Sequence, residues 1–299
     1  MENENKKGLK TSPLLVILFI VLAVYTLMFL LPALWTVITS LKETRYYMQA
    51  TVKKDLALMM GLEHLTLENF VTAYESFDIP IQSGERIHLI PMFGNSLLYA
   101  GGCAVIATIV PCVMAYLTAR YDYQLGKIVH TIVLVTMAIP IVGALPSEMK
   151  MVDSLGLMDS VVGLYVLKAN FLGIYFLVFY AQFKTIPKDY TEAASIDGAS
   201  EWYIMVQIIF PIAFGAISTV LLLNFIQFWN DYQIPMIYWE SRPVVAYGMY
   251  YFASRNTGKL GPTPIKLSAM IMVATPIIIL FIIFNQQIMA NMSIGGVKG

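Results

Sequence analysis

Polar side chains interrupt an apolar stretch of the chain between positions 224 and 231. Asn224, Gln227 and Asp231 are separated by three and then four positions, so a helix would place them on one face, with Asn230 beside them. An ionisable group deep in lipid costs about 2.5–3.5 kcal/mol, so we expect this face to line a polar path for a solute. The alternative interpretation is that Asn224 and Gln227 only join neighbouring helices and that Asp231 already lies at the surface.

Other residues with chemical potential lack the spacing that a site needs. Cys103 and Cys112 are nine residues apart in one apolar stretch, on opposite faces of a helix, which indicates two buried thiols rather than a disulfide or metal pair. His64, His88 and His130 show no spacing typical of metal ligands. No G-x-x-x-x-G-K-[ST] pattern is present, so we do not expect this chain itself to cradle the phosphates of ATP.

The sequence from Ile186 to Trp202 predicts two short helices joined by a sharp turn. Glu192 lies early in the first helix, where the helix dipole favours a negative charge. Gly198 stands where a left-handed cap would end that helix. Ser200 can cap a second helix that runs toward residue 210 and ends at Pro211.

The turn between these helices is rich in small residues. Ala193, Ala194, Gly198 and Ala199 form a low surface that lets another backbone approach closely. One interpretation is that a second protein docks there. The other is that the two short helices only pack on each other, and the residues alone leave both open.

Long apolar blocks must position these residues. Hydrophobic residues make up 58% of the 299 positions and charged residues 13%, and the mean hydropathy is +0.68. A span across about 30 Å of hydrocarbon needs about 20 residues, which most of six charge-free blocks supply. The fourth block is short and needs its flanking residues to span. These blocks predict an all-α membrane protein with about six transmembrane helices: Thr11–Leu41, Ile87–Ala119, Ile128–Ser147, Ala169–Phe183, Trp202–Asn230 and Leu267–Val297.

The charges that flank the blocks predict the topology. Lys6, Lys7 and Lys10 precede the first block, which is too long for a signal peptide and places the N-terminus in the cytoplasm. Six crossings return the C-terminus to the same side. The net charge is zero without a basic run, so no nucleic-acid partner is expected. The expected parts are a cytoplasmic N-terminus 1–12 and a transmembrane domain 13–299, with outside segments 42–90 and 232–264, a cytoplasmic loop 184–210 and a cytoplasmic tail 291–299.

The cytoplasmic loop resembles a known family signature. Glu192-Ala193-Ala194 followed by Asp197-Gly198-Ala199 and by Ile208 to Pro211 resembles the EAA loop of binding-protein-dependent ABC importer permeases. Phe210 stands where leucine is usual in that family. The resemblance implies an ABC type I importer permease fold and a helix that docks in a groove of a separate ATPase subunit. The residues implied to couple to the ATPase are Glu192, Ala193, Ala194, Asp197, Gly198 and Ala199.

Weaker patterns in the same order narrow the resemblance to the maltose-type, carbohydrate-importing branch. Leu67 to Phe70, Asn95 to Leu97, Trp229-Asn230 and the glycine-rich tail each resemble a segment of that branch. The segment from Tyr46 to Glu63 has no counterpart there. The resemblance implies that the tail lies near the ATPases, with Gly295, Gly296, Lys298 and Gly299 in it. It also implies an outward loop, Ser254 to Pro262, that contacts the binding protein through Arg255, Asn256, Thr257 and Gly258; an interfacial aromatic belt would explain the aromatic residues before it.

The resemblance also implies the partners. They are a second, different permease, two ATPase subunits that hold ATP and magnesium, and an extracytoplasmic sugar-binding protein, in the lipid of a bacterial or archaeal cytoplasmic membrane. This chain is then a pore-forming subunit without an enzymatic site, a cofactor or a metal of its own. The alternative is an ion-coupled secondary transporter, which should show interrupted spans with paired acidic residues at mid-membrane. A membrane-embedded enzyme would need a convergent acid, base or nucleophile set.

Overall fold

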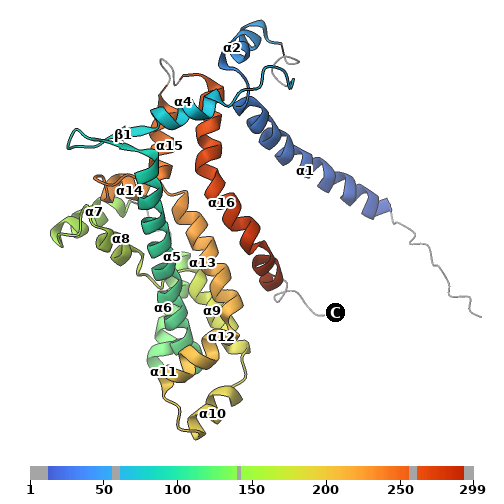
Figure 1. Ribbon diagram of the computed structural model, residues 1–299. Helices are drawn as coiled ribbons and strands as arrows, with labels where there is room; N and C mark the ends of the chain where they lie inside the picture. Colours follow the sequence, from blue (N-terminus) through green and yellow to red (C-terminus); the bar gives the residue numbers. More distant parts are fainter. Residues whose placement is uncertain (1–12, 56–60, 140–142, 256–260, 293–299) are drawn as a thin grey trace, which may run out of the picture. The chain divides into compact units, whose positions relative to one another are not determined.

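The computed structural model describes residues 13–55, 61–139, 143–255 and 261–292, and most of these residues are helical (Figure 1). The chain divides into two compact units. One contains the residues up to Ser76 together with Arg255–Met272, and the other contains Phe77–Ser254 together with the residues from Val273 onward. The expectation of a helical chain is confirmed, with one small addition among the described residues, a two-stranded hairpin.

The first unit begins with a helix that buries almost nothing within this chain. Helix α1 (Pro13–Ser40) exposes apolar side chains all round, and only its last two residues are buried. A helix that is hydrophobic on every side is suited to lipid or to a partner subunit rather than to water. Three further helices contribute to this unit: α2 (Thr44–Lys53), α4 (Glu68–Ser76) and the beginning of α16 (Thr263–Met292).

Asn69 ties the end of α1 to α4. Its side-chain nitrogen donates to the carbonyl oxygens of Ser40 at 2.8 Å and of Lys42 at 2.6 Å, and its side-chain oxygen accepts from the Thr44 hydroxyl at 2.8 Å. Asn69 is 4% exposed, so these bonds satisfy polar groups that are shielded from water. The Leu67 to Phe70 pattern therefore has a structural reason in this chain.

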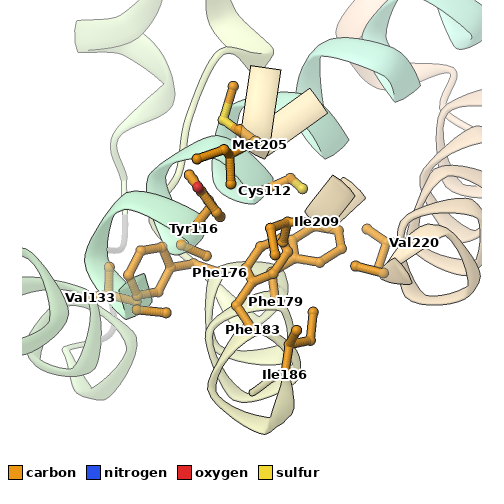
Figure 2. Packing of buried hydrophobic residues seen from close by; sticks show 14 residues of the cluster. Cys112, Tyr116, Val133, Phe176, Phe179, Phe183, Ile186, Met205, Ile209 and Val220 are labelled. Carbon is orange, nitrogen blue, oxygen red and sulfur yellow. The ribbon is translucent and has the colours of Figure 1, made fainter. Parts of the chain in front are cut away.

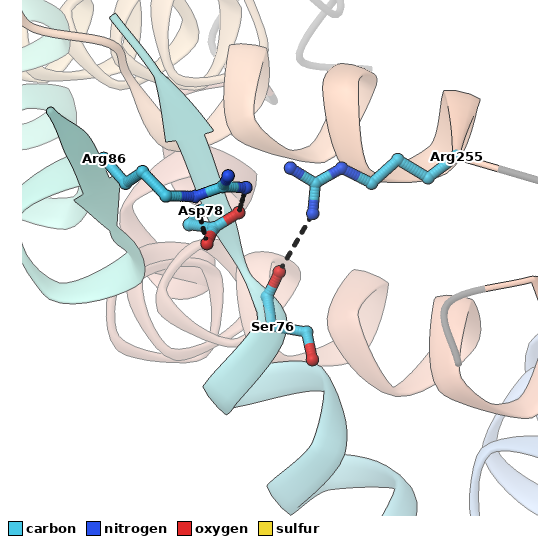
Figure 3. A network of polar contacts seen from close by, with 4 residues as sticks. All are labelled: Ser76, Asp78, Arg86 and Arg255. Atoms are coloured by element: carbon cyan, nitrogen blue, oxygen red, sulfur yellow. Dashed lines mark hydrogen bonds and ion pairs between the residues drawn. The ribbon is translucent and has the colours of Figure 1, made fainter. Parts of the chain in front are cut away.

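The second unit is organised around its longest helix, α5, against which α9 and α13 pack. The hairpin of β1 and β2 leads into α5 and is held by two hydrogen bonds from the Arg86 guanidinium to the Asp78 carboxylate (Figure 3). The elements of this unit are β1 (Asp78–Pro80), β2 (Arg86–His88), α5 (Leu89–Arg120), α6 (Gln124–Ala138), α7 (Leu145–Ser154), α8 (Val161–Lys168), α9 (Ile174–Thr185), α10 (Asp189–Ile196), α11 (Glu201–Tyr203), η1 (Ile204–Ile209), α12 (Phe210–Ile212), α13 (Phe214–Trp229), α14 (Gln233–Tyr238) and α15 (Val245–Ser254).

Two hydrogen bonds fix α15 to the beginning of α5. The Asn95 side chain donates to the Pro243 carbonyl oxygen at 3.0 Å, and the Ser96 hydroxyl accepts from the backbone N–H of Val245 at 2.7 Å. Ser96 is buried, and its hydroxyl supplies an acceptor that the first turn of α15 lacks. The Asn95 to Leu97 pattern thus connects two segments that lie far apart in the sequence.

The helices match the six apolar blocks unequally. Within the described residues, α1, α5 and α16 are each long and apolar enough to cross a membrane alone. The third block forms α6 with 15 residues, and the fourth forms α9 with 12 residues, separated from α8 by a non-helical link. The shortness expected for the fourth block is therefore real.

The fifth block is not one straight helix. It consists of a helical segment Glu201–Ile212 and helix α13, which meet at an angle of 79°. The break at Ala213 follows Pro211, whose ring removes one backbone donor and crowds the preceding turn. Residues 204–209 form a π-helix, which the apolar pattern does not indicate. The short second helix therefore ends one residue beyond Pro211 instead of at it.

A buried aromatic cluster joins α5, α9 and the bent segment (Figure 2). The ring of Tyr116 lies edge-on to Phe183 at 5.6 Å and to Phe210 at 6.2 Å, measured between ring centroids. Cys112 is buried in the same cluster as a free thiol, and Cys103 is a second buried thiol in α5. Phe179, Ile204 and Ile209 complete the centre of the cluster, which supports the loop that follows α9.

Candidate functional site

The loop between α9 and α11 has the predicted helix, turn and cap. Helix α10 ends at Ile196, and Gly198 follows in the left-handed region with φ +80°. The N–H groups of Gly198 and Ala199 donate to the carbonyls of Ser195 and Ala194, which closes the helix end. The Ser200 hydroxyl accepts a hydrogen bond from the backbone N–H of Tyr203, the last residue of α11, at 3.3 Å. The predictions for Gly198 and Ser200 are confirmed.

The residues of α10 divide between an outer and an inner surface. Glu192, Ala193, Asp197 and Gly198 are exposed, and no residue of α10 is fully buried. Ala194 and Ala199 are half-buried and pack against the aromatic cluster. Of the four small residues for which the sequence left two interpretations, Ala193 and Gly198 are exposed, as the docking interpretation requires. Ala194 and Ala199 instead pack within the chain.

Two large side chains on α10 were missed by the sequence interpretation. Tyr190 is 52% exposed and Ile196 is 86% exposed, although both are apolar enough to be buried. Figure 1 shows α10 standing beyond the ends of α9 and α11, with no other element of its unit over its outer side. An exposed apolar patch on such a helix is typical of a docking surface. The signal in the sequence was the presence of these two large side chains in a short helix whose other residues are small or polar.

Arg120 at the end of α5 holds the start of this loop. Its guanidinium donates to the carbonyl oxygen of Ile186 at 2.8 Å and to that of Pro187 at 3.2 Å. The next residue, Tyr121, donates a hydrogen bond to the carboxylate of Glu201 in α11. Burial, and then the hydrogen bond to Glu201, raise the pKa of Tyr121, so this donor keeps its proton at neutral pH. Both ends of the loop are therefore attached to the end of α5.

The four polar residues expected to share one face have separate surroundings. Asn224 is 2% exposed and donates to the Thr108 hydroxyl of α5 at 3.0 Å, so it joins two helices. Asp231 accepts from the Tyr99 hydroxyl at 2.8 Å and from the backbone of α14. Gln227 and Asn230 are exposed, and the Asn230 side chain bonds to its own helix.

A cavity of about 310 Å³ adjoins the first half of this set. Asn224 and Gln227 line it together with Lys168 at the end of α8 and Asn170 in the link between α8 and α9. The Lys168 ammonium lies 5.4 Å from the centroid of the Phe228 ring, within the range of a cation–π contact. Amide groups and aromatic rings thus meet beside the middle of α5. Asp231 and Asn230 are not among the residues that line this cavity.

The outward loop and the tail lie mostly outside the described residues. Of the four residues expected to contact a binding protein, Arg255 is described, whereas Asn256, Thr257 and Gly258 lie in the range 256–260, which the structure does not describe. The Arg255 guanidinium donates to the Ser76 carbonyl oxygen at 3.3 Å (Figure 3). The tail residues Gly295, Gly296, Lys298 and Gly299 also lie outside the described residues.

Comparison with protein families shows to which family this chain belongs. The model of the family of binding-protein-dependent transport system inner membrane components matches residues 107–293, which is more than half of the sequence. The chain belongs to this family. The matched range includes the loop with α10, the bent fifth block and the cavity beside α5.

Three relatives match between 73% and 97% of this chain. The diacetylchitobiose uptake system permease protein of Streptomyces coelicolor is 23% identical over 92% of this chain and 86% of its own length. The melibiose/raffinose/stachyose import permease protein of Bacillus subtilis is 27% identical over 73% of this chain and 79% of its own length. The arabinooligosaccharides transport system permease protein of Halalkalibacterium halodurans is 24% identical over 97% and 99%.

A solved structure shows the same fold as this transport component. A chain from the crystal structure of a bacterial ABC transporter involved in the import of the acidic polysaccharide alginate superimposes with a TM-score of 0.73. The match covers 96% of this chain and 99% of the other, at 18% sequence identity. The expectation of an ABC importer permease fold is thereby confirmed.

Proposed function

We propose that this chain is one of two different permease subunits of an ATP-driven oligosaccharide importer in a bacterial or archaeal cytoplasmic membrane. The observation that carries the proposal is the exposed helix α10, which ends in the left-handed turn at Gly198. Hydrogen bonds from Arg120 and Tyr121 join the segments before and after α10 to the end of α5. A helix that is attached at both ends and exposed on its outer surface is suited to transmit a force from a docked partner.

The docked partner is a separate ATPase subunit that holds ATP and magnesium. Glu192, Ala193, Asp197 and Gly198 form the exposed contact, and Tyr190 and Ile196 add an apolar anchor to it. Ala194 and Ala199 instead fix the helix to its own chain. The tail with Gly295, Gly296, Lys298 and Gly299 reaches the two ATPase subunits in this proposal. ATP-driven closure of those subunits switches the permease pair between inward-facing and outward-facing states.

The substrate is an oligosaccharide delivered by an extracytoplasmic binding protein. Relatives that match most of this chain are permeases for diacetylchitobiose, for melibiose, raffinose and stachyose, and for arabinooligosaccharides, according to their names. Gln227 offers its exposed amide to sugar hydroxyls at the cavity beside α5. Asn224 forms part of the cavity wall while it bonds to Thr108, and Asn230 and Asp231 continue the path outward. Arg255 and the residues after it, Asn256, Thr257 and Gly258, contact the binding protein in this proposal.

An ion-coupled secondary transporter is the less favoured alternative. The link between α8 and α9 and the bend at Ala213 are interruptions of the kind such transporters show. Coupling ions also need carboxylates at mid-membrane, and neither Asp nor Glu occurs in α1, α5, α6, α9, α13 or α16. Interrupted helices without acidic partners are better suited to a passive path that other subunits drive.

Reconstitution distinguishes these two functions. The complex that copurifies with this chain is placed in proteoliposomes with an excess of its binding protein, and uptake of the sugar retained by that protein is measured. We expect uptake to require ATP inside the vesicle and to persist when ion gradients are removed by ionophores. Uptake that an imposed proton or sodium gradient drives without ATP would overturn the proposal.

A further inference from the structure

A second cavity, also of about 310 Å³, lies where the end of α5, the beginning of α6 and the end of α9 meet. Its lining carries four basic side chains and one acidic one: Arg120, Lys127, Lys184, Lys188 and Asp122. Hydroxyl groups of Thr131 and Tyr180 share the lining, so both charge and hydrogen-bond donors face one concave space. Such a combination is suited to an anion with several acceptor oxygens.

The positive charge of this cavity is only weakly neutralised by the protein. The Lys127 ammonium lies 3.3 Å from the Asp122 carboxylate, but the two side chains are 76% and 82% exposed, and exposed pairs of this kind are weak. The Lys184 ammonium lies 5.5 Å from the centroid of the Tyr180 ring, a contact that leaves its hydrogens able to donate. The lysines can therefore turn toward a bound anion.

Helix α6, which forms one wall of the cavity, also exposes apolar side chains on its outer face. Helix α6 exposes Leu125, Ile128, Ile132 and Val135 as it leads away from the basic residues, and these side chains are 44–67% exposed. The rings of His130 and Tyr180 lie 4.5 Å apart at the inner wall, where α6 meets α9. A basic pocket at a helix end next to an exposed apolar helix matches a ligand with an anionic head and hydrocarbon tails.

We propose that this cavity binds the headgroup of an anionic phospholipid. The phosphate accepts hydrogen bonds from Lys127 and Lys184, and the acyl chains lie along the exposed side of α6. Lys188 lies both in the cavity lining and in the segment that leads into α10, and Arg120 of the lining hydrogen-bonds to that segment. An occupied site therefore steadies the loop that, in the proposed function, contacts the ATPase. A free phosphate would find the same charges but would gain nothing from the apolar surface of α6.

The test uses the whole purified complex, stripped of lipid in detergent and titrated with phosphatidylglycerol or phosphatidylcholine of identical chains. Native mass spectrometry counts the bound lipids. We expect one phosphatidylglycerol to bind well before others, and a double variant, Lys127→Gln with Lys184→Gln, to bind it roughly 30-fold more weakly. The matched control is Lys53→Gln with Lys150→Gln, two exposed lysines distant in sequence from the cavity.

A second variant and a competitor keep the result unambiguous. Asp122→Asn removes the one acidic side chain of the cavity and should tighten phosphatidylglycerol binding by about fivefold. Equal binding of phosphatidylcholine, unchanged binding by the Lys127 and Lys184 double variant, or displacement of the lipid by inorganic phosphate at low millimolar concentration would each overturn the proposal. The last outcome would indicate a site for soluble anions instead.

Discussion

The Arg120 guanidinium donates a hydrogen bond to the Ile186 carbonyl oxygen at 2.8 Å, although 66 positions separate these residues in the chain. This bond attaches the segment that enters α10 to the end of the longest helix of its unit. A movement of α10 must therefore either carry the end of α5 with it or break a charge-assisted hydrogen bond, which contributes about 1.5–3 kcal/mol.

Replacing Arg120 with lysine tests this attachment. Lysine keeps the positive charge but cannot span two carbonyls with a planar fork, so at least one of the two bonds is lost. We expect Arg120→Lys to reach the membrane in normal amounts and to reduce ATP-dependent uptake by about tenfold. Arg45→Lys, at an exposed position, is the matched control. Wild-type uptake by Arg120→Lys would mean that the attachment has no part in coupling.

The turn at Gly198 predicts opposite outcomes for two substitutions. An added Cβ would meet no atom within 4 Å, so only the φ of +80° restricts this position. Valine adopts this conformation only at a cost of about 1–3 kcal/mol, whereas asparagine tolerates it. Gly198→Val should therefore lose most ATPase retention in a pull-down normalised to permease amount, and Gly198→Asn should keep it. Equal retention by both variants would contradict a requirement for the left-handed turn.

Asn224 and Gln227 should differ in what their loss affects. The buried bond from Asn224 to Thr108 joins α13 to α5, so a double-mutant cycle with Asn224→Ala and Thr108→Ala should give a coupling energy of about 0.6–1.7 kcal/mol in thermal unfolding. Gln227→Ala removes an exposed amide and should change uptake without changing the unfolding temperature. A lower unfolding temperature for Gln227→Ala, with unchanged uptake, would show that Gln227 too only joins helices.

Asn69 should be the most sensitive polar position of the first unit. Asn69→Ala removes donors to the carbonyl oxygens of Ser40 and Lys42 in a site that is 4% exposed. The Ser40 carbonyl keeps its second hydrogen bond, from the Ser268 hydroxyl at 3.0 Å. The two lost hydrogen bonds are worth about 0.5–1.5 kcal/mol each, so the unfolding temperature in detergent should fall by several degrees. Gln49→Ala, at an exposed position of α2, should leave it unchanged, and a similar change in both variants would contradict this role for Asn69.

Local chemistry explains which features the sequence could predict. Gly198 and Ser200 act through their own backbone and immediate neighbours, so their roles were readable from residue type and spacing alone. Arg120 and Asn69 act on carbonyls many positions away, and a sequence gives no direct sign of such partners. The one-face argument for Asn224 and Asp231 assumed a continuous helix, but α13 ends at Trp229, and Asp231 instead caps the following helix.

The break at Ala213 gives the segment before it the mechanics of a lever. The arm from Glu201 to Ile212 has 12 residues and so extends about 18 Å. A rotation of about 10° at Ala213 displaces the far end of such an arm by about 3 Å, which is the scale of a helix shift at a subunit interface. Because the arm meets α13 at 79°, a push directed along the arm turns into a sideways load on α13. A straight fifth helix would carry the same push along its own axis, without that change of direction.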